Sequence, residues 1–229
     1  LLNEETLRKF FGETWKKSGF FSPEMAYSFK VAKVAAGMGY KWIVADELAF
    51  PAGKKLSPDT IYKISGLDNF SIFFRERNLS FIVLSAQAGT AAGTASVILR
   101  FLGDRLSKNE YAVTAMDGET FGHHRPGLET RLFDLMKEEK ITHVKISELQ
   151  DIFKKKSSLE PRPSTWAATK KDMKDVTPFS RWDKKENEIQ QRQWRLTELA
   201  IKTATREPRS GEARKLLDEA LHSDQYWWA

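Results

Sequence analysis

The sequence of 229 residues contains no cysteine. That absence excludes disulfides, thiolate nucleophiles and cysteine-ligated zinc sites. No apolar run approaches the roughly 18 residues that a membrane-spanning helix needs, and no signal-peptide pattern precedes the first helical pattern. We therefore expect no membrane partner and a cytoplasmic location.

The chain also lacks a strong excess of one charge. It has 37 Lys and Arg against 31 Asp and Glu, a formal net charge of +6. Its only dense basic run, residues 154–156, adjoins a Pro- and Ser-rich stretch and is interpreted as a solvated linker. We expect no nucleic-acid partner, since such proteins usually gather basic charge on one face. The 41% hydrophobic and 12% aromatic content excludes a disordered chain.

Strand-like and helix-like segments alternate through residue 153. Expected strands are residues 20–21, 41–45, 70–74, 110–116 and 141–146. Expected helices are residues 4–17, 27–38, 96–106 and 127–139, while 81–84 is open between strand and helix and 48–68 is a loop. The alternation favours an α/β fold with a parallel sheet or barrel. Charged residues follow most strands, which predicts one common rim.

The composition changes after residue 153. Residues 154–165 hold Pro161, Pro163 and several serines and are interpreted as a linker. Two polar helices are expected at 183–206 and 210–222. We divide the chain into the C-terminal part of a barrel (1–153), the linker and a helical region (166–229) packed on the barrel rim. The helices could instead pack on another subunit, so a homo-oligomer stays open. Because the chain starts at Leu1 in a helical pattern and ends after three aromatic residues, we interpret it as part of a longer protein.

One loop concentrates chemically active side chains. Asp117, Glu119, His123 and His124 fall within residues 116–127, together with Arg125 and three glycines that allow close backbone approach to a ligand. We therefore take this loop as the first site candidate. The alternative is that the carboxylates are rim charges and the histidines cap a helix.

Glu24 is the second candidate. It follows Pro23 at the end of an apolar strand, and taken alone it is better interpreted as a charge favoured at a helix N-terminus. If Glu24 faces Asp117 across a barrel rim, the two residues form a pair of carboxylates that could act together. Two facing carboxylates are what glycoside cleavage needs, one as nucleophile and one as acid and base.

The sequence resembles glycoside hydrolase family 57. Residues 19–27 (GFFSPEMAY) resemble its nucleophile region and 115–124 (AMDGETFGHH) resemble its acid/base region, in the same order. Residues 42–47, 73–76, 164–166 and 223–228 are similar to other family segments. The resemblance implies an incomplete (β/α)7-type parallel barrel followed by an α-helical region. The family's N-terminal His-Gln-Pro and Gly-Asn-Glu-type regions are absent.

The resemblance also implies a function. The family mostly acts on α-glucans by a retaining mechanism, as amylases, glucanotransferases or branching enzymes. Glu24 would be the nucleophile and Asp117 the acid/base. Arg75, Glu119, His123, His124, Trp166, Asp224 and Trp227 would bind the sugar. Neither cofactor nor metal is implied, and the partner is an oligosaccharide or polysaccharide.

Two other classes of function stay open. One is a metal-dependent polysaccharide deacetylase on a related barrel. It needs a cluster of Asp and His ligands, and here only His123 and His124 cluster, with Asp117 and Glu119. The other is a non-catalytic carbohydrate-binding homologue. The two retained carboxylates argue against it, and the missing N-terminal strands argue for it.

Overall fold

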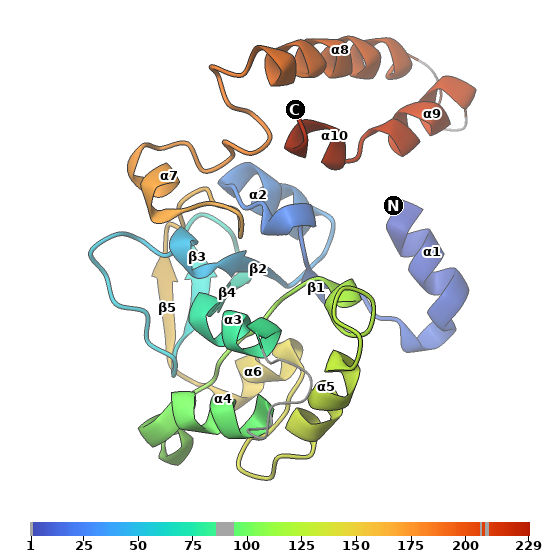
Figure 1. The fold of residues 1–229 in the computed structure, drawn as a ribbon. Helices are drawn as coiled ribbons and strands as arrows, with labels where there is room; N and C mark the ends of the chain where they lie inside the picture. The colour runs from blue at the N-terminus through green and yellow to red at the C-terminus, as the bar shows by residue number, and fades with distance from the viewer. Residues whose placement is uncertain (1, 86–93, 207, 209–210) are drawn as a thin grey trace.

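Five strands form one mixed sheet in the order β1-β2-β4-β3-β5 (Figure 1). The computed structural model describes residues 2–85, 94–206, 208 and 211–229. The strands are β1 (Gly19–Phe20), β2 (Trp42–Asp46), β3 (Ile61–Ile64), β4 (Ser71–Arg75) and β5 (Lys156–Leu159). Strands β1, β2 and β4 run parallel, β3 is antiparallel to β4, and β5 is parallel to β3. The expected α/β class is confirmed, with β3 and β5 running in the direction opposite to β1, β2 and β4.

The central strands are buried on both faces. Every residue of β4 is buried, and β2 is buried from Ile43 to Asp46. Ile72 and Phe74 face one apolar cluster, whereas Phe73 faces a second cluster. A strand covered on both faces reads as a continuous apolar run rather than an alternating one. That run is why the sequence predicted both strands.

Helices and short 3-10 turns connect and cover the sheet. They are α1 (Leu2–Phe11), α2 (Phe29–Gly37), α3 (Arg77–Ser85), α4 (Thr94–Leu102), α5 (Leu128–Met136) and α6 (Ile146–Ile152). In helix α2, the sequence accounts for both ends of the helix. The Ser28 hydroxyl accepts a hydrogen bond from the backbone N–H of Val31, and the chain leaves the helix at Gly39 with φ of +88°.

The chain continues after the sheet into a helical region. Its helices are α7 (Lys170–Lys174), α8 (Glu188–Ala204), α9 (Glu212–Ala220) and α10 (Asp224–Trp227). Asn187 caps α8 by accepting hydrogen bonds from the N–H groups of Ile189 and Gln190. Helix α8 packs against α9, as Figure 1 shows in orange and red. The helices predicted at 183–206 and 210–222 are thus present.

Two predicted strands are wrong. Residues 110–116 make a single bridge, Arg75 with Val113, and residues 141–146 make no strand pairing in the described part of the chain. The carbonyl of Val113 accepts a 2.8 Å hydrogen bond from the backbone N–H of Glu76, just after β4. Both segments have strand-like sequences, but a strand requires a neighbour to pair with.

Two segments expected as irregular contain strands, and an ambiguous one is helical. Strand β3 lies within 48–68, where its four residues are too few to stand out from the turn residues around them. Strand β5 lies within 154–165, so this segment is not simply a linker. Lys155, just before β5, forms an ion pair with Asp59, just before β3. Residues 81–84 belong to α3. The division into domains itself stays a prediction.

Candidate active site

Glu24 lies in a strained turn directly after β1. Residues Pro23–Met25 form a 3-10 turn in which Glu24 has φ of +56° and Met25 has φ of +49°. Such left-handed backbone is uncommon outside glycine and costs about 1–3 kcal/mol per residue. Met25 is fully buried in the apolar cluster beneath β2 and β4, which holds the turn in place. Strain that the surrounding structure maintains is typical of a functional position.

Trp166 holds the Glu24 carboxylate. Its indole Nε1 donates a hydrogen bond of 2.8 Å to Oε2 of Glu24. The backbones run together nearby, since Tyr27 and Ser164 exchange N–H···O bonds of 2.8 and 3.1 Å. The Phe21 ring meets the Trp166 ring edge-on at 5.8 Å. Trp166 is therefore fixed beside Glu24 by backbone pairing and by ring packing.

Arg75, at the end of β4, connects this turn with the loop that carries Asp117. It is only 3% exposed. Its NH1 donates to Oδ2 of Asp46 at 3.2 Å, and its Nε donates to the carbonyl of Ala115 at 2.7 Å. The guanidinium carbon lies 5.8 Å from the centre of the Trp166 ring. Burial lowers the pKa of Arg75 and the adjacent Asp46 carboxylate opposes that shift. Arg75 therefore lies buried between the turn that carries Glu24 and the loop that carries Asp117.

The two carboxylates at the end of β2, Asp46 and Glu47, are bonded to Arg75 and to its neighbour Arg77. Asp46 is fully buried and also accepts a 2.9 Å hydrogen bond from NH1 of Arg77. Glu47 accepts a hydrogen bond of 3.1 Å from the backbone N–H of Arg77. Burial raises the pKa of Glu47 above its ordinary value, and the charge of Asp46 adds to that rise. Sequence analysis had not assigned these two carboxylates a role.

The Asp117 loop follows Ala115 and is open to solvent. Asp117 precedes a 3-10 turn, Gly118–Thr120, and its carbonyl accepts from the N–H of Thr120 at 3.1 Å. The carbonyl of Glu119 accepts from the N–H groups of both His123 and His124. The two imidazole rings lie 5.3 Å apart. The side chains of all four predicted residues in this loop are exposed: Asp117, Glu119, His123 and His124.

A cavity of about 430 Å³ opens beside Glu24. One wall comes from the turn, with Pro23, Glu24 and Ala26. The other wall comes from the helical region: Phe179, Trp182, Asp183, Trp194, Thr197, Ile201, Leu221, His222, Ser223 and Tyr226. A mostly apolar and aromatic hollow with a few polar groups is the usual form of a small-molecule site.

The aromatic wall is held rigidly. Trp194 stacks on Tyr226 with ring centres 4.4 Å apart and donates its Nε1–H to the carbonyl of Trp182 at 2.8 Å. The Tyr226 hydroxyl contacts the hydroxyl of Thr197. Neither Trp182 nor Trp194 was among the predicted site residues. Their spacing in the sequence carries no signal that they share a cavity with Glu24.

The predicted residues near the chain end take different positions. Trp227 packs on Trp182 with ring centres 5.2 Å apart, and the Arg181 guanidinium lies over its ring. Asp224 is exposed at the start of α10. Neither residue lines the cavity beside Glu24, although their neighbours Ser223 and Tyr226 do.

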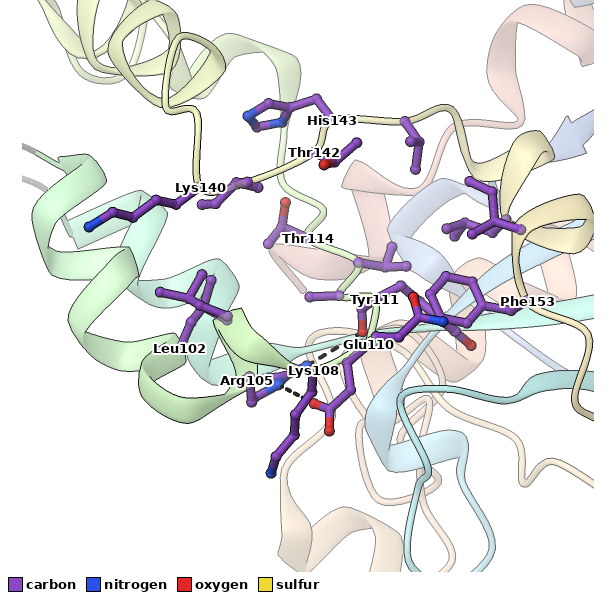
Figure 2. Close-up of a pocket in the computed structure, with 18 of the residues that line it drawn as sticks. Leu102, Arg105, Lys108, Glu110, Tyr111, Thr114, Lys140, Thr142, His143 and Phe153 are labelled. Atoms are coloured by element: carbon purple, nitrogen blue, oxygen red, sulfur yellow. Dashed lines mark hydrogen bonds and ion pairs between the residues drawn. The ribbon is translucent and has the colours of Figure 1, made fainter.

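A second cavity, of about 560 Å³, shares no lining residue with the first (Figure 2). It lies between residues 102–114 and 140–153, the two parts of the chain that contain the segments wrongly predicted as strands. Figure 2 shows Arg105 paired with Glu110 on one side, at 3.0 Å, and His143 on the other. None of the predicted site residues lines this cavity.

Two further properties concern the described residues only. No helix among them is both long and apolar enough to cross a membrane. No group of three His, Cys, Asp or Glu side chains among them is arranged to hold a metal ion.

Comparison with known proteins identifies the family. Residues 2–162 match the profile of Glycosyl hydrolase family 57. No curated protein matches the sequence. Among solved structures, the fold is similar to the 4-alpha-glucanotransferase from Thermococcus litoralis, with a TM-score of 0.67 and 18% sequence identity. The similarity covers 99% of this chain and 40% of that one. Because the family profile covers well over half of the sequence, this chain belongs to glycosyl hydrolase family 57.

Proposed function

We propose that this chain carries the catalytic carboxylates of an enzyme that cleaves or transfers α-glucan chains with retention of configuration. The observation that carries the proposal is the setting of Glu24. This carboxylate lies in a strained turn, is held by Trp166, and opens into an aromatic-lined cavity. Family membership and the glucanotransferase-like fold support the same substrate class.

In this mechanism Glu24 is the nucleophile. The Trp166 hydrogen bond occupies Oε2, so we assign the attack on the anomeric carbon to Oε1. The bond from that carbon to the leaving oxygen breaks while the bond to Glu24 forms. Asp117 gives its proton to the leaving oxygen. The sugar is then held on Glu24 as a covalent glycosyl-enzyme.

In the second step Asp117 acts as base. It removes a proton from water, giving hydrolysis, or from a sugar hydroxyl, giving transfer. The oxygen of that acceptor bonds to the anomeric carbon while the bond from this carbon to Glu24 breaks. Contacts link the two carboxylates through the protein: Trp166 bonds to Glu24 and lies beside Arg75, which bonds to Ala115, two residues before Asp117. We propose that Trp166 and Arg75 position the two groups, and that Trp182, Trp194 and Tyr226 contact sugar faces.

The remaining predicted residues keep proposed roles. Glu119, His123 and His124 would contact the sugar from the Asp117 loop, where they are exposed. Asp224 and Trp227 would act from the start of α10, next to the cavity wall.

The test uses a polypeptide that contains residues 1–229 and any sequence that naturally flanks them. It is incubated with maltooligosaccharides, and the products are separated by chromatography. Shorter or redistributed oligosaccharides are expected, and they should be lost in Glu24→Gln and Asp117→Asn. The exposed residues Glu139 and Asp151 supply matched controls, Glu139→Gln and Asp151→Asn, which should keep activity. No products from the unmodified protein, or binding of the sugar without turnover, would overturn the proposal.

A further inference from the structure

Arg77 bonds to the end of β2 and to the segment that holds Glu24. It is the first residue of α3, two positions after the end of β4, and its side chain is 18% exposed. Its NH1 donates to Oδ1 of Asp46 at 2.9 Å, and its NH2 donates to the backbone carbonyl of Trp166 at 3.1 Å. The backbone N–H of Arg77 also donates to Oε2 of Glu47. The guanidinium is therefore fixed on the sheet side by carboxylates while one branch reaches Trp166.

Asp46 does not depend on Arg77 for its hydrogen bonds. Its Oδ2 accepts from Arg75 at 3.2 Å, and its Oδ1 also accepts from the backbone N–H of Leu48 at 3.0 Å. Both oxygens of this fully buried carboxylate would keep a donor without Arg77. The distinct contribution of the second guanidinium is thus its bond to the Trp166 carbonyl.

Trp166 connects Arg77 to Glu24. Its indole Nε1 donates to Oε2 of Glu24 at 2.8 Å, and its backbone N–H donates to the Glu24 carbonyl at 3.4 Å. Trp166 itself lies in a turn, outside the helices and strands that hold other peptide groups in place. A bond from a charged donor to its carbonyl is stronger than one between neutral groups. Hydrogen bonds therefore run without a break from Asp46 through Arg77 and Trp166 to Glu24.

We propose that Arg77 is a positioning residue for Glu24, acting through Trp166. The proposal rests on the proposed role of Glu24 as the nucleophile. Arg77 fixes the Trp166 peptide, and the Trp166 indole then holds Oε2 of Glu24 so that Oε1 can attack the anomeric carbon. Lysine has the charge but not the fork of donors, so it cannot bond to Asp46 and to the Trp166 carbonyl together. Small displacements of a reacting group reduce the rate strongly.

The first test is kinetic. With α-maltotriosyl fluoride in single turnovers, Arg77→Lys and Arg77→Gln should slow fluoride release about tenfold or more, the factor that a lost charge-assisted hydrogen bond gives. Their apparent affinity for the donor should stay nearly unchanged. Because fluoride leaves with little help from an acid, Asp117→Asn should keep most of this rate, so a loss in the Arg77 variants reports the Glu24 step.

The matched control is Arg162→Lys. Arg162 also donates to two backbone carbonyls, at 2.9 and 3.3 Å, but neither belongs to Trp166. This control should lower the melting temperature while leaving fluoride release by the folded protein unchanged. Full fluoride release by both Arg77 variants, or an equal loss in Arg162→Lys, would overturn the proposal.

The second test needs no turnover. The protein has seven tryptophans, and Trp166→Phe identifies the indole N–H signal of Trp166 in a nitrogen–proton NMR spectrum. Arg77→Lys should shift this signal toward its position in Glu24→Gln, whereas Arg162→Lys should not. An unmoved signal would overturn the positioning role even in an active enzyme. A shifted signal in a protein that releases no fluoride would instead overturn the nucleophile assignment of Glu24, and this proposal with it.

Discussion

The indole Nε1 of Trp166 donates a 2.8 Å hydrogen bond to Oε2 of Glu24, although 142 positions separate the two residues. This bond joins the turn after β1 to the segment after β5. It fixes one carboxylate oxygen of Glu24, a residue that also lines the cavity. Because the turn after β1 is strained, this hydrogen bond is expected to help hold Glu24 in position.

Trp166→Phe should reduce turnover by about 10-fold to 100-fold, since a hydrogen bond to a charged group contributes about 1.5–3 kcal/mol. The substitution keeps an aromatic ring beside Phe21 and Arg75. The measurement is kcat on a maltooligosaccharide, together with the melting temperature. The matched control is Trp42→Phe, which removes an indole N–H that has no hydrogen-bond partner within the described part of the chain. Equal losses in the two variants would show that the Glu24 contact is not special.

Arg75→Lys should destabilise the fold by about 2 kcal/mol, because lysine keeps the charge but cannot donate to Asp46 and Ala115 together. The loop that carries Asp117 should also lose its anchor, so kcat should fall further than stability alone explains. Urea unfolding and kinetics on the folded protein separate the two effects. Unchanged stability would contradict the buried bridging role of Arg75.

Glu47→Gln should stabilise the protein at neutral pH. The pKa of Glu47 is raised by burial, so the folded state favours its neutral form. The stability associated with protonation is present below the unfolded pKa of about 4.5 and is lost as the pH rises through the raised folded value. Melting temperatures of the two proteins should therefore differ at pH 7 and converge near pH 4. A difference that is constant with pH would contradict the assignment.

Gly19→Ala should destabilise the protein by about 2 kcal/mol or more, because an added Cβ would lie 2.1 Å from atoms of the Trp42 ring. Gly37→Ala is the control. Nothing lies within 4 Å of its added Cβ, and alanine there should raise stability by up to about 1 kcal/mol. Chemical denaturation measures both, and equal effects of the two changes would contradict the close packing of Trp42 on β1.

The elements that the sequence predicted well are those with a strong local signal. Strands β2 and β4 are continuous apolar runs, and α8 has a polar cap at Asn187 and a long helical pattern. Both candidate carboxylates also lie in local motifs, one after Pro23 and one in a glycine-rich loop. Local sequence patterns of this kind can be recognised without a structure.

The features that could not be predicted depend on distant contacts. Residues 110–116 have strand propensity, but strand formation requires a paired neighbour, and only Val113 has one. Strand β3 forms because β4 and β5 flank it. Likewise, Trp182 and Trp194 line a cavity with Glu24 only after the helical region packs near the turn. No spacing within the sequence predicts that Trp182 and Trp194 lie near Glu24.

The most direct test of the central assignment is the stereochemistry of azide rescue, measured by NMR of the products formed from an α-maltotriosyl fluoride donor. In Glu24→Gly, azide should replace the nucleophile and give the β-glycosyl azide. In Asp117→Ala, azide should attack the glycosyl-enzyme on Glu24 and give the α-glycosyl azide. Opposite anomers in this order are what the account predicts. The same anomer from both variants, the reverse order, or no azide product from either variant of an active enzyme would contradict it.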